Sequence, residues 1–98
     1  MAVYIIAQLK FKDRDAYNRY QAKFFGVFKR FKGQVLAADE KPLRLEGDWD
    51  RDKVVIMSFP DQAEAERFMH DPEYAEISKD RHAGADTVSV LVRGLQMP

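Results

Sequence analysis

The chain has 98 residues, of which 46% are hydrophobic and 33% charged, values typical of a globular domain. Sixteen Lys and Arg residues balance sixteen Asp and Glu residues, so no overall field favours nucleic acid or an anionic membrane. The absence of cysteine excludes disulfides, thiol nucleophiles and Cys-ligated metals. We expect one domain over residues 1–98, with no nucleic-acid or membrane partner.

The first predicted element is Val3–Leu9, which carries apolar side chains on both sides of an extended chain. This pattern is typical of a strand near the middle of a sheet. The segment is too short to span a membrane, and no basic residues precede it as they would in an export signal. We therefore expect a soluble, cytoplasmic protein.

An aromatic stripe comes next. Asp13 is a predicted helix N-cap, Gly33 a predicted stop, and Gly26 a point where the helix kinks or restarts. Between the two ends, aromatic residues recur at helical spacing: Tyr17, Tyr20, Phe24, Phe28 and Phe31. The stripe either belongs to the core, as its spacing favours, or lines a pocket for a flat apolar ligand.

Two further strands are predicted in the middle of the chain. Gln34–Asp39 forms the first, and the alternating Leu43–Glu46 extends it past a bend. The charged segment Gly47–Asp52 reads as a turn. The strand after it, Lys53–Phe59, has no polar alternation before Ser58, which predicts burial on both faces.

The second helical region spans residues 61–84. Asp61 with Glu64 three residues later forms a capping-box pattern. Asp71 followed by Pro72 opens a second short helix, which ends near Gly84.

The last strand is predicted at Thr87–Val92, ahead of a short tail ending at Met97-Pro98. The order βαββαβ predicts an α+β, ferredoxin-like antiparallel sheet with helices on one face and the first and third strands in its centre. The other face would stay apolar, so we expect a homodimer through this sheet face. One set of side chains, or the opposite set, would lie on it: Tyr4, Ile6, Val55 and Met57.

Five short segments are typical of one known family: Asp15-Ala16-Tyr17, Phe31-Lys32-Gly33, Leu45-Glu46-Gly47-Asp48-Trp49, Phe59-Pro60 and Asp71-Pro72-Glu73-Tyr74. Through them almost the whole chain resembles the bacterial DUF1330 family, although Arg14 stands where relatives often have proline. The resemblance implies the dimeric α+β barrel superfamily, in which two ferredoxin-like subunits pack sheet to sheet. The family has no established activity, and the superfamily includes monooxygenases, haem-degrading enzymes and muconolactone isomerase.

Glu46 is the predicted catalytic acid or base. It lies near Arg44 and Trp49, where partial burial would suit it to proton transfer. The alternative is a structural ion pair with Arg44 or Arg81. The residues predicted to position a ligand are Tyr17, Tyr20, Arg44, Tyr74 and Arg81.

No metal or other cofactor is expected. His70 and His82 lack acidic partners at ligand spacing and read as helix-end residues. The acidic residues of the 47–52 turn lack the glycine and distal glutamate of a calcium loop.

Two functions from different classes remain open, and the sequence does not decide whether the protein is an enzyme. One is a small metal-free enzyme or binder acting on a small, partly aromatic or apolar metabolite. The other is a non-catalytic ligand-binding or structural dimer. A cavity of roughly a few hundred Å³ beside Glu46 and the tyrosines would favour the first, and a filled core the second.

Overall fold

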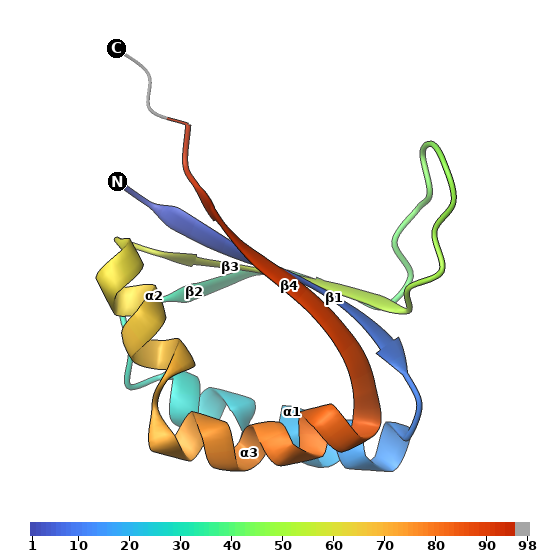
Figure 1. Cartoon of the computed structure of the whole chain (residues 1–98), viewed down its shortest axis with the longest axis horizontal. Coiled ribbons are helices and arrows are strands. Elements are labelled where there is room, and N and C mark those ends of the chain that lie inside the picture. Colours follow the sequence, from blue (N-terminus) through green and yellow to red (C-terminus); the bar gives the residue numbers. More distant parts are fainter. Residues whose placement is uncertain (96–98) are drawn as a thin grey trace.

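A computed structural model describes residues 1–95 of the chain (Figure 1). The predicted order of elements is confirmed, including the second short helix that opens after Asp71. The predicted tail at Met97-Pro98 lies outside the described residues. The elements are β1 (Val3–Phe11), α1 (Arg14–Phe28), β2 (Gln34–Asp39), β3 (Lys53–Phe59), α2 (Gln62–Met69), α3 (Pro72–Gly84) and β4 (Ala85–Arg93).

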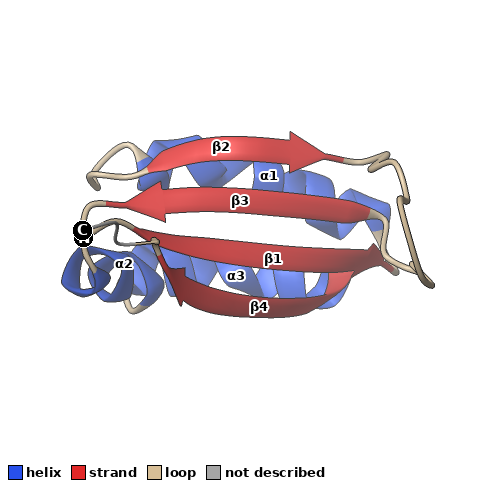
Figure 2. Ribbon diagram, turned by 90° about the horizontal axis from the view of Figure 1, so that it is seen from above, coloured by secondary structure: helices blue, strands red, loops and turns tan. Residues whose placement is uncertain are grey.

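The four strands form one antiparallel sheet in the order β2-β3-β1-β4 (Figure 2). The two strands with apolar residues on both sides, β1 and β3, are its central strands, as predicted. All three helices lie against one face of this sheet, which gives a two-layer α+β fold (Figures 1 and 2). Within residues 1–95, no helix lies over the other face.

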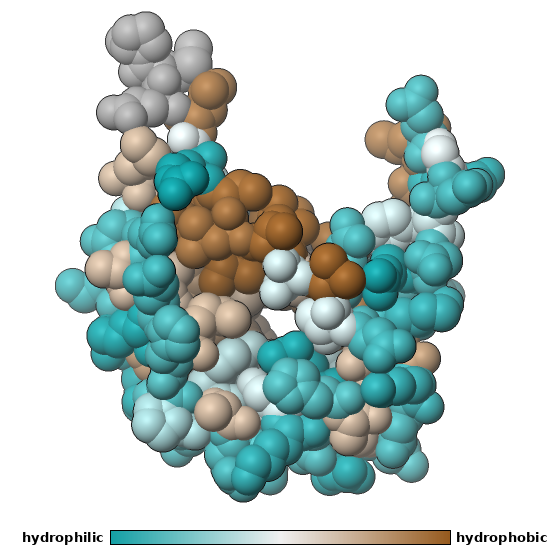
Figure 3. All heavy atoms as spheres, in the orientation of Figure 1, coloured by the Kyte–Doolittle hydropathy of each residue, from teal (hydrophilic) through white to brown (hydrophobic). Residues whose placement is uncertain are grey.

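Strand register sets the contents of each face. Ile6 pairs with Ile56, and Ala7 pairs with Val55. Because paired residues of antiparallel strands point to the same side, the expected grouping of Ile6 with Val55 was wrong. Val55 faces the helices. Apolar side chains gather on the uncovered face, here called the outer face (Figure 3): Tyr4, Ile6, Val54, Ile56, Val88, Val90 and Val92.

The predicted extension of β2 through Leu43–Glu46 was wrong. The register of β2 shifts between Val35 and Ala37, and the strand ends at Asp39. Residues 40–52 then form a loop that projects beyond the sheet (Figure 1). Pro42, which has no N–H to donate to a ladder, lies at its start.

The predicted helix N-caps are confirmed. The carboxylates of Asp13, Asp61 and Asp71 each accept a hydrogen bond from the backbone N–H three residues later, at 3.3, 2.8 and 3.0 Å. The second half of the capping box was wrong. The Glu64 carboxylate accepts from the N–H of Lys32 at 2.8 Å instead of reaching back to Asp61.

Helix α1 is continuous through Gly26 and ends at Phe28, before the predicted stop at Gly33. The turn after it returns Phe31 to the core. Aromatic rings from both layers pack closely at this end of the molecule, with 5.3 Å between the ring centroids of Phe28 and Phe68. This aromatic cluster comprises Phe24, Phe28, Phe31, Phe59, Phe68 and Tyr74.

Candidate ligand-binding site

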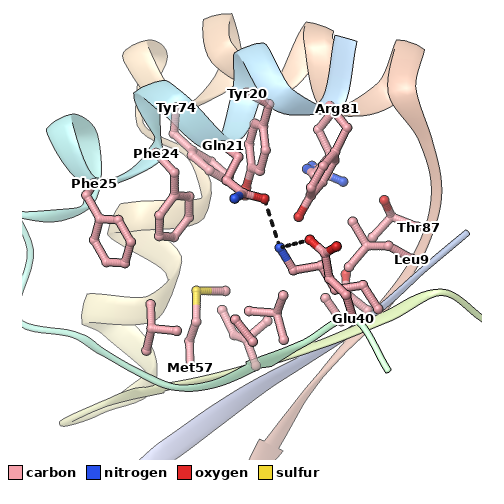
Figure 4. A pocket seen from close by; sticks show the side chains of 18 of the residues that line it. Leu9, Tyr20, Gln21, Phe24, Phe25, Glu40, Met57, Tyr74, Arg81 and Thr87 are labelled. Atoms are coloured by element: carbon pink, nitrogen blue, oxygen red, sulfur yellow. Dashed lines mark hydrogen bonds and ion pairs between the residues drawn. The ribbon is translucent and has the colours of Figure 1, made fainter. Parts of the chain in front are cut away.

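A cavity of about 430 Å³ lies between the inner face of the sheet and helices α1 and α3 (Figure 4). The aromatic cluster fills the space between the two layers at one end, but beyond it the side chains do not close the gap. The small side chain of Ala7, in the central strand β1, contributes to this space. The sheet side of the cavity is mostly aliphatic: Ile5, Ala7, Leu9, Val35, Val55 and Met57.

The aromatic stripe of α1 contributes both to the core and to the wall of the cavity, the two alternatives that its spacing left open. Phe28 packs in the core and does not line the cavity. Tyr17, Tyr20 and Phe24 are also buried, yet each contributes to the cavity wall. The core and pocket interpretations therefore apply to different parts of the same stripe.

The phenol groups of Tyr20 and Tyr74 meet at the cavity wall. Their hydroxyl oxygens are 2.9 Å apart, and both side chains are buried. Burial raises the pKa of Tyr20 far above its ordinary value, and the neighbouring Tyr74 raises it further. Tyr20 is therefore a neutral phenol and does not serve as a base.

Lys53 is the most buried cation of the site, with 5% of the residue exposed. Its ammonium donates to the Gln21 amide oxygen at 3.0 Å, lies 3.6 Å from a Glu40 carboxylate oxygen and is 4.9 Å from the centre of the Tyr17 ring. Glu40 also accepts a 2.8 Å hydrogen bond from Arg14. This bond, with Lys53 contributing less, lowers the pKa of Glu40.

Two polar groups that line the cavity are buried without a partner. The Nε of Arg81, in the last turn of α3, has no hydrogen-bond acceptor among the described residues, and the hydroxyl of Thr87 in β4 has no partner there. Figure 4 shows Arg81 and Thr87 at the same end of the cavity as Glu40, with Phe24 and Phe25 at the other end.

Four of the six predicted site residues line the cavity: Tyr17, Tyr20, Tyr74 and Arg81. Arg44 and Glu46 do not. Both are exposed in the loop of residues 40–52, and within residues 1–95 no ion pair joins Glu46 to Arg44 or Arg81. The predicted roles of all six residues stay predictions.

Three polar groups of the cavity wall, on the sheet and at the start of the loop, were not predicted from the sequence. Lys53 has the same strand parity as Val55 and Met57, so strict alternation would have placed it on the helix side. The same reasoning applies to Thr87 in β4. The position of Glu40 depends on the register shift in β2, and no simple sequence pattern predicts that shift.

The histidines lie at helix ends, as expected: His70 caps the C-terminus of α2, and His82 is in the last turn of α3. Across residues 1–95, the structure contains no group of three or more His, Asp and Glu side chains that could hold a metal ion. No helix in the described part of the chain is long and apolar enough to cross a membrane.

These features define a two-layer, ferredoxin-like α+β protein with a ligand-sized cavity between its layers. The model of the family described as "domain of unknown function (DUF1330)" matches residues 2–95, and the chain belongs to this family. No curated protein matches the sequence.

Solved structures share the fold. A protein of unknown function from Rhodopseudomonas palustris, RPA0582, is 24% identical, with a TM-score of 0.81 over 98% of this chain and 84% of that one. SnoaB from Streptomyces nogalater, described as a cofactor-independent oxygenase, is 18% identical, with a TM-score of 0.70 over 98% and 95%. A dimeric protein of unknown function and ferredoxin-like fold from Bacteroides fragilis is 11% identical, with a TM-score of 0.63 over 95% and 96%.

Proposed function

We propose that this protein is a homodimer in which each subunit binds a small, partly aromatic or apolar metabolite in the cavity between helices and sheet. The observation that carries the proposal is the cavity of about 430 Å³, with aromatic and aliphatic walls and a few polar groups at one end. Pockets for small molecules have this size and lining. A purely structural dimer would be expected to fill such a space, because protein interiors are close-packed.

Binding without turnover is the form of the proposal that the geometry supports best. General acid–base catalysis needs a group that titrates near the working pH and reaches the substrate. Glu40, the carboxylate of the cavity wall, is paired with Arg14 and Lys53, and Tyr20 holds its proton.

An enzyme acting without a bound metal is the second candidate. Its support is the shared fold with SnoaB, and a fold alone does not transfer an activity. Glu46 as its acid or base remains a proposal, one that requires the loop of residues 40–52 to bring this carboxylate to a cavity. Replacement of Glu46 by glutamine tests it: unchanged binding and unchanged turnover of any identified substrate would exclude the role.

The homodimer part of the proposal rests on the outer face. Val88 and Val90 are 50% and 53% exposed there, within a larger apolar surface. Surfaces of this kind in stable proteins are usually covered by a partner, and a twofold interface commonly buries about 800 Å² on each side. One protein of the same fold is described as dimeric. The cytoplasmic location expected from the sequence stays a prediction.

The cavity is tested by titrating the protein with 2-naphthamide, a flat neutral probe, in a calorimeter. The Ala7→Phe variant projects an aromatic ring into the cavity from β1, so we expect its affinity to fall about tenfold or more while its folding stability holds or rises. Ala22→Phe, on the exposed side of α1, is the matched control and should bind like the wild type. Equal binding by Ala7→Phe and the wild type would exclude the proposed pocket. So would a wild type that binds neither 2-naphthamide nor its carboxylate analogue 2-naphthoate.

A further inference from the structure

The two unpartnered groups of the cavity wall call for an explanation. A buried donor without an acceptor destabilises a protein, and such groups are rare in native structures. Arg81 Nε and Thr87 Oγ1 both belong to this class, and both line the same cavity. An oxygen atom of a bound molecule would give each of them a partner.

The contacts of Arg81 leave its charge without a protein counterpart. No carboxylate pairs with it among the described residues, in contrast to Arg14, Arg19 and Arg30. Its Nη2 atom lies 3.4 Å from Nε2 of the adjacent His82, and its guanidinium carbon is 5.7 Å from the centre of the Tyr20 ring. Neither contact supplies a negative charge.

The charges around the cavity favour a single negative charge on the ligand. Its lining includes two cations, Lys53 and Arg81, and one carboxylate, Glu40. Glu40 already accepts from Arg14 and forms an ion pair with Lys53, whereas Arg81 is a cation of the lining with no carboxylate partner among the described residues. A doubly charged group such as a phosphate would place an uncompensated charge near Glu40 in a partly buried site.

The shape of the cavity adds an apolar requirement. Toward the end opposite Arg81 the wall is formed mainly by rings and apolar side chains, including Phe24, Phe25 and Met57 (Figure 4). A ligand that fills both ends must therefore carry its charged group at one end of an apolar body. The planar guanidinium group matches the two oxygens of a carboxylate.

We infer that the cavity binds a flat or aromatic monocarboxylic acid, with Arg81 holding the carboxylate, Thr87 donating a second hydrogen bond and the apolar body lying toward Phe24 and Phe25. This inference rests on the proposed ligand-binding function and narrows it to a chemical class. The competing ligand is a neutral molecule whose amide or hydroxyl oxygen accepts the same hydrogen bonds.

The test compares 2-naphthoate with 2-naphthamide, which has nearly the same shape and no charge. At pH 7 we expect the wild type to bind the carboxylate about tenfold more tightly than the amide. Arg81→Met should remove this preference by weakening the carboxylate while changing the amide little, and Arg81→Lys should restore part of it. Thr87→Val should weaken both probes to a smaller extent.

Arg19→Met is the matched control, because Arg19 is an exposed arginine of α1 that pairs with Asp80 and does not line the cavity. It should keep the wild-type preference. Equal affinity of the wild type for the two probes, or equal weakening of both by Arg81→Met, would overturn the inference and leave the pocket itself standing. Failure of both probes to bind the wild type would overturn the proposed function. Should Arg81→Met not fold, the Arg81→Lys and Thr87→Val variants give the same comparison.

Discussion

At the scale of single residues, the hydroxyl pair of Tyr20 and Tyr74 ties α1 to α3 beside the cavity. Each oxygen supplies the partner that the other needs in a buried position. Tyr17 differs, since its hydroxyl has no hydrogen-bond partner among the described residues although its ring also lines the cavity. Tyr17 can therefore serve as a comparison for the two tyrosines whose hydroxyls share a hydrogen bond.

We predict that Tyr20→Phe lowers the free energy of unfolding by about 1–2 kcal/mol, because it leaves the Tyr74 hydroxyl buried and unpartnered. The double variant with Tyr74→Phe should lose less than the sum of the single losses, because it removes both hydroxyls. Urea unfolding of the four proteins measures this coupling. Tyr17→Phe is the control, and a loss as large as that of Tyr20→Phe would contradict the assignment.

The candidate site was predictable in part at this scale. Tyr17 and Tyr20 were found because aromatic residues at helical spacing point to one side of a helix, and that side faces the sheet. Lys53 was missed although strand parity places it with Val55. Glu46 drew attention through its neighbours in sequence, whereas the carboxylate at the cavity is Glu40, which the end of β2 positions.

At the scale of elements, the junction between α3 and β4 is fixed by Gly84. Its carbonyl accepts hydrogen bonds from the N–H groups of Lys12 and Asp13, at 2.9 and 3.1 Å. A Cβ atom at this position would lie 2.5 Å from the backbone nitrogen of Tyr17 and 2.8 Å from the carbonyl oxygen of Asp13. The start of α1 and the end of α3 therefore meet with no space for a side chain.

We predict that Gly84→Ala destabilises the protein by about 2–3 kcal/mol, because backbone atoms on both sides must move apart. Gly26→Ala is the matched control. Nothing lies within 4 Å of a Cβ at Gly26, which is exposed inside α1, so the substitution should stabilise by about 0.5–1 kcal/mol. Opposite signs in urea unfolding are the expected result, and equal effects would contradict this account of the junction.

Local sequence signals predicted where helices begin better than they predicted which distant residues those helix starts contact. Asp61 caps α2 as its sequence predicts. Glu64 instead accepts from the guanidinium of Arg67 and from the N–H of Lys32, which together lower its pKa to about 2. Lys32 is distant in sequence, and a local motif carries no information about it. The same limit explains the wrong extension at Leu43–Glu46, whose alternation has no neighbouring strand to satisfy it.

At the scale of the whole molecule, topology was the most predictable property. Apolar residues on both sides of β1 and β3 indicated central strands, and the element order left only a few sheets to consider. The cavity was not predictable in this way. It depends on how far the aromatic cluster holds the helices from the sheet, a spacing that no linear pattern encodes.

The assembly is tested at the outer face. We predict that Val90→Lys weakens self-association by about a hundredfold or more, because the new charge would be buried without a partner in a sheet-to-sheet dimer. The subunit itself should fold normally, since Val90 is 53% exposed within it. Sedimentation equilibrium at micromolar concentration measures both proteins, with Ala75→Lys on the exposed side of α3 as control. A monomeric wild type, or an unaffected Val90 variant, would contradict the dimer.

The central strands present alternate residues to two environments: Ile5 and Ala7 of β1 face the cavity, while Tyr4 and Ile6 face away from the helices. Substitutions at odd positions of this strand can reshape the cavity and leave the surface formed by even positions unchanged. In the proposed dimer, evolution can therefore change what the cavity binds and keep the subunit interface, because different codons specify the two sets of residues.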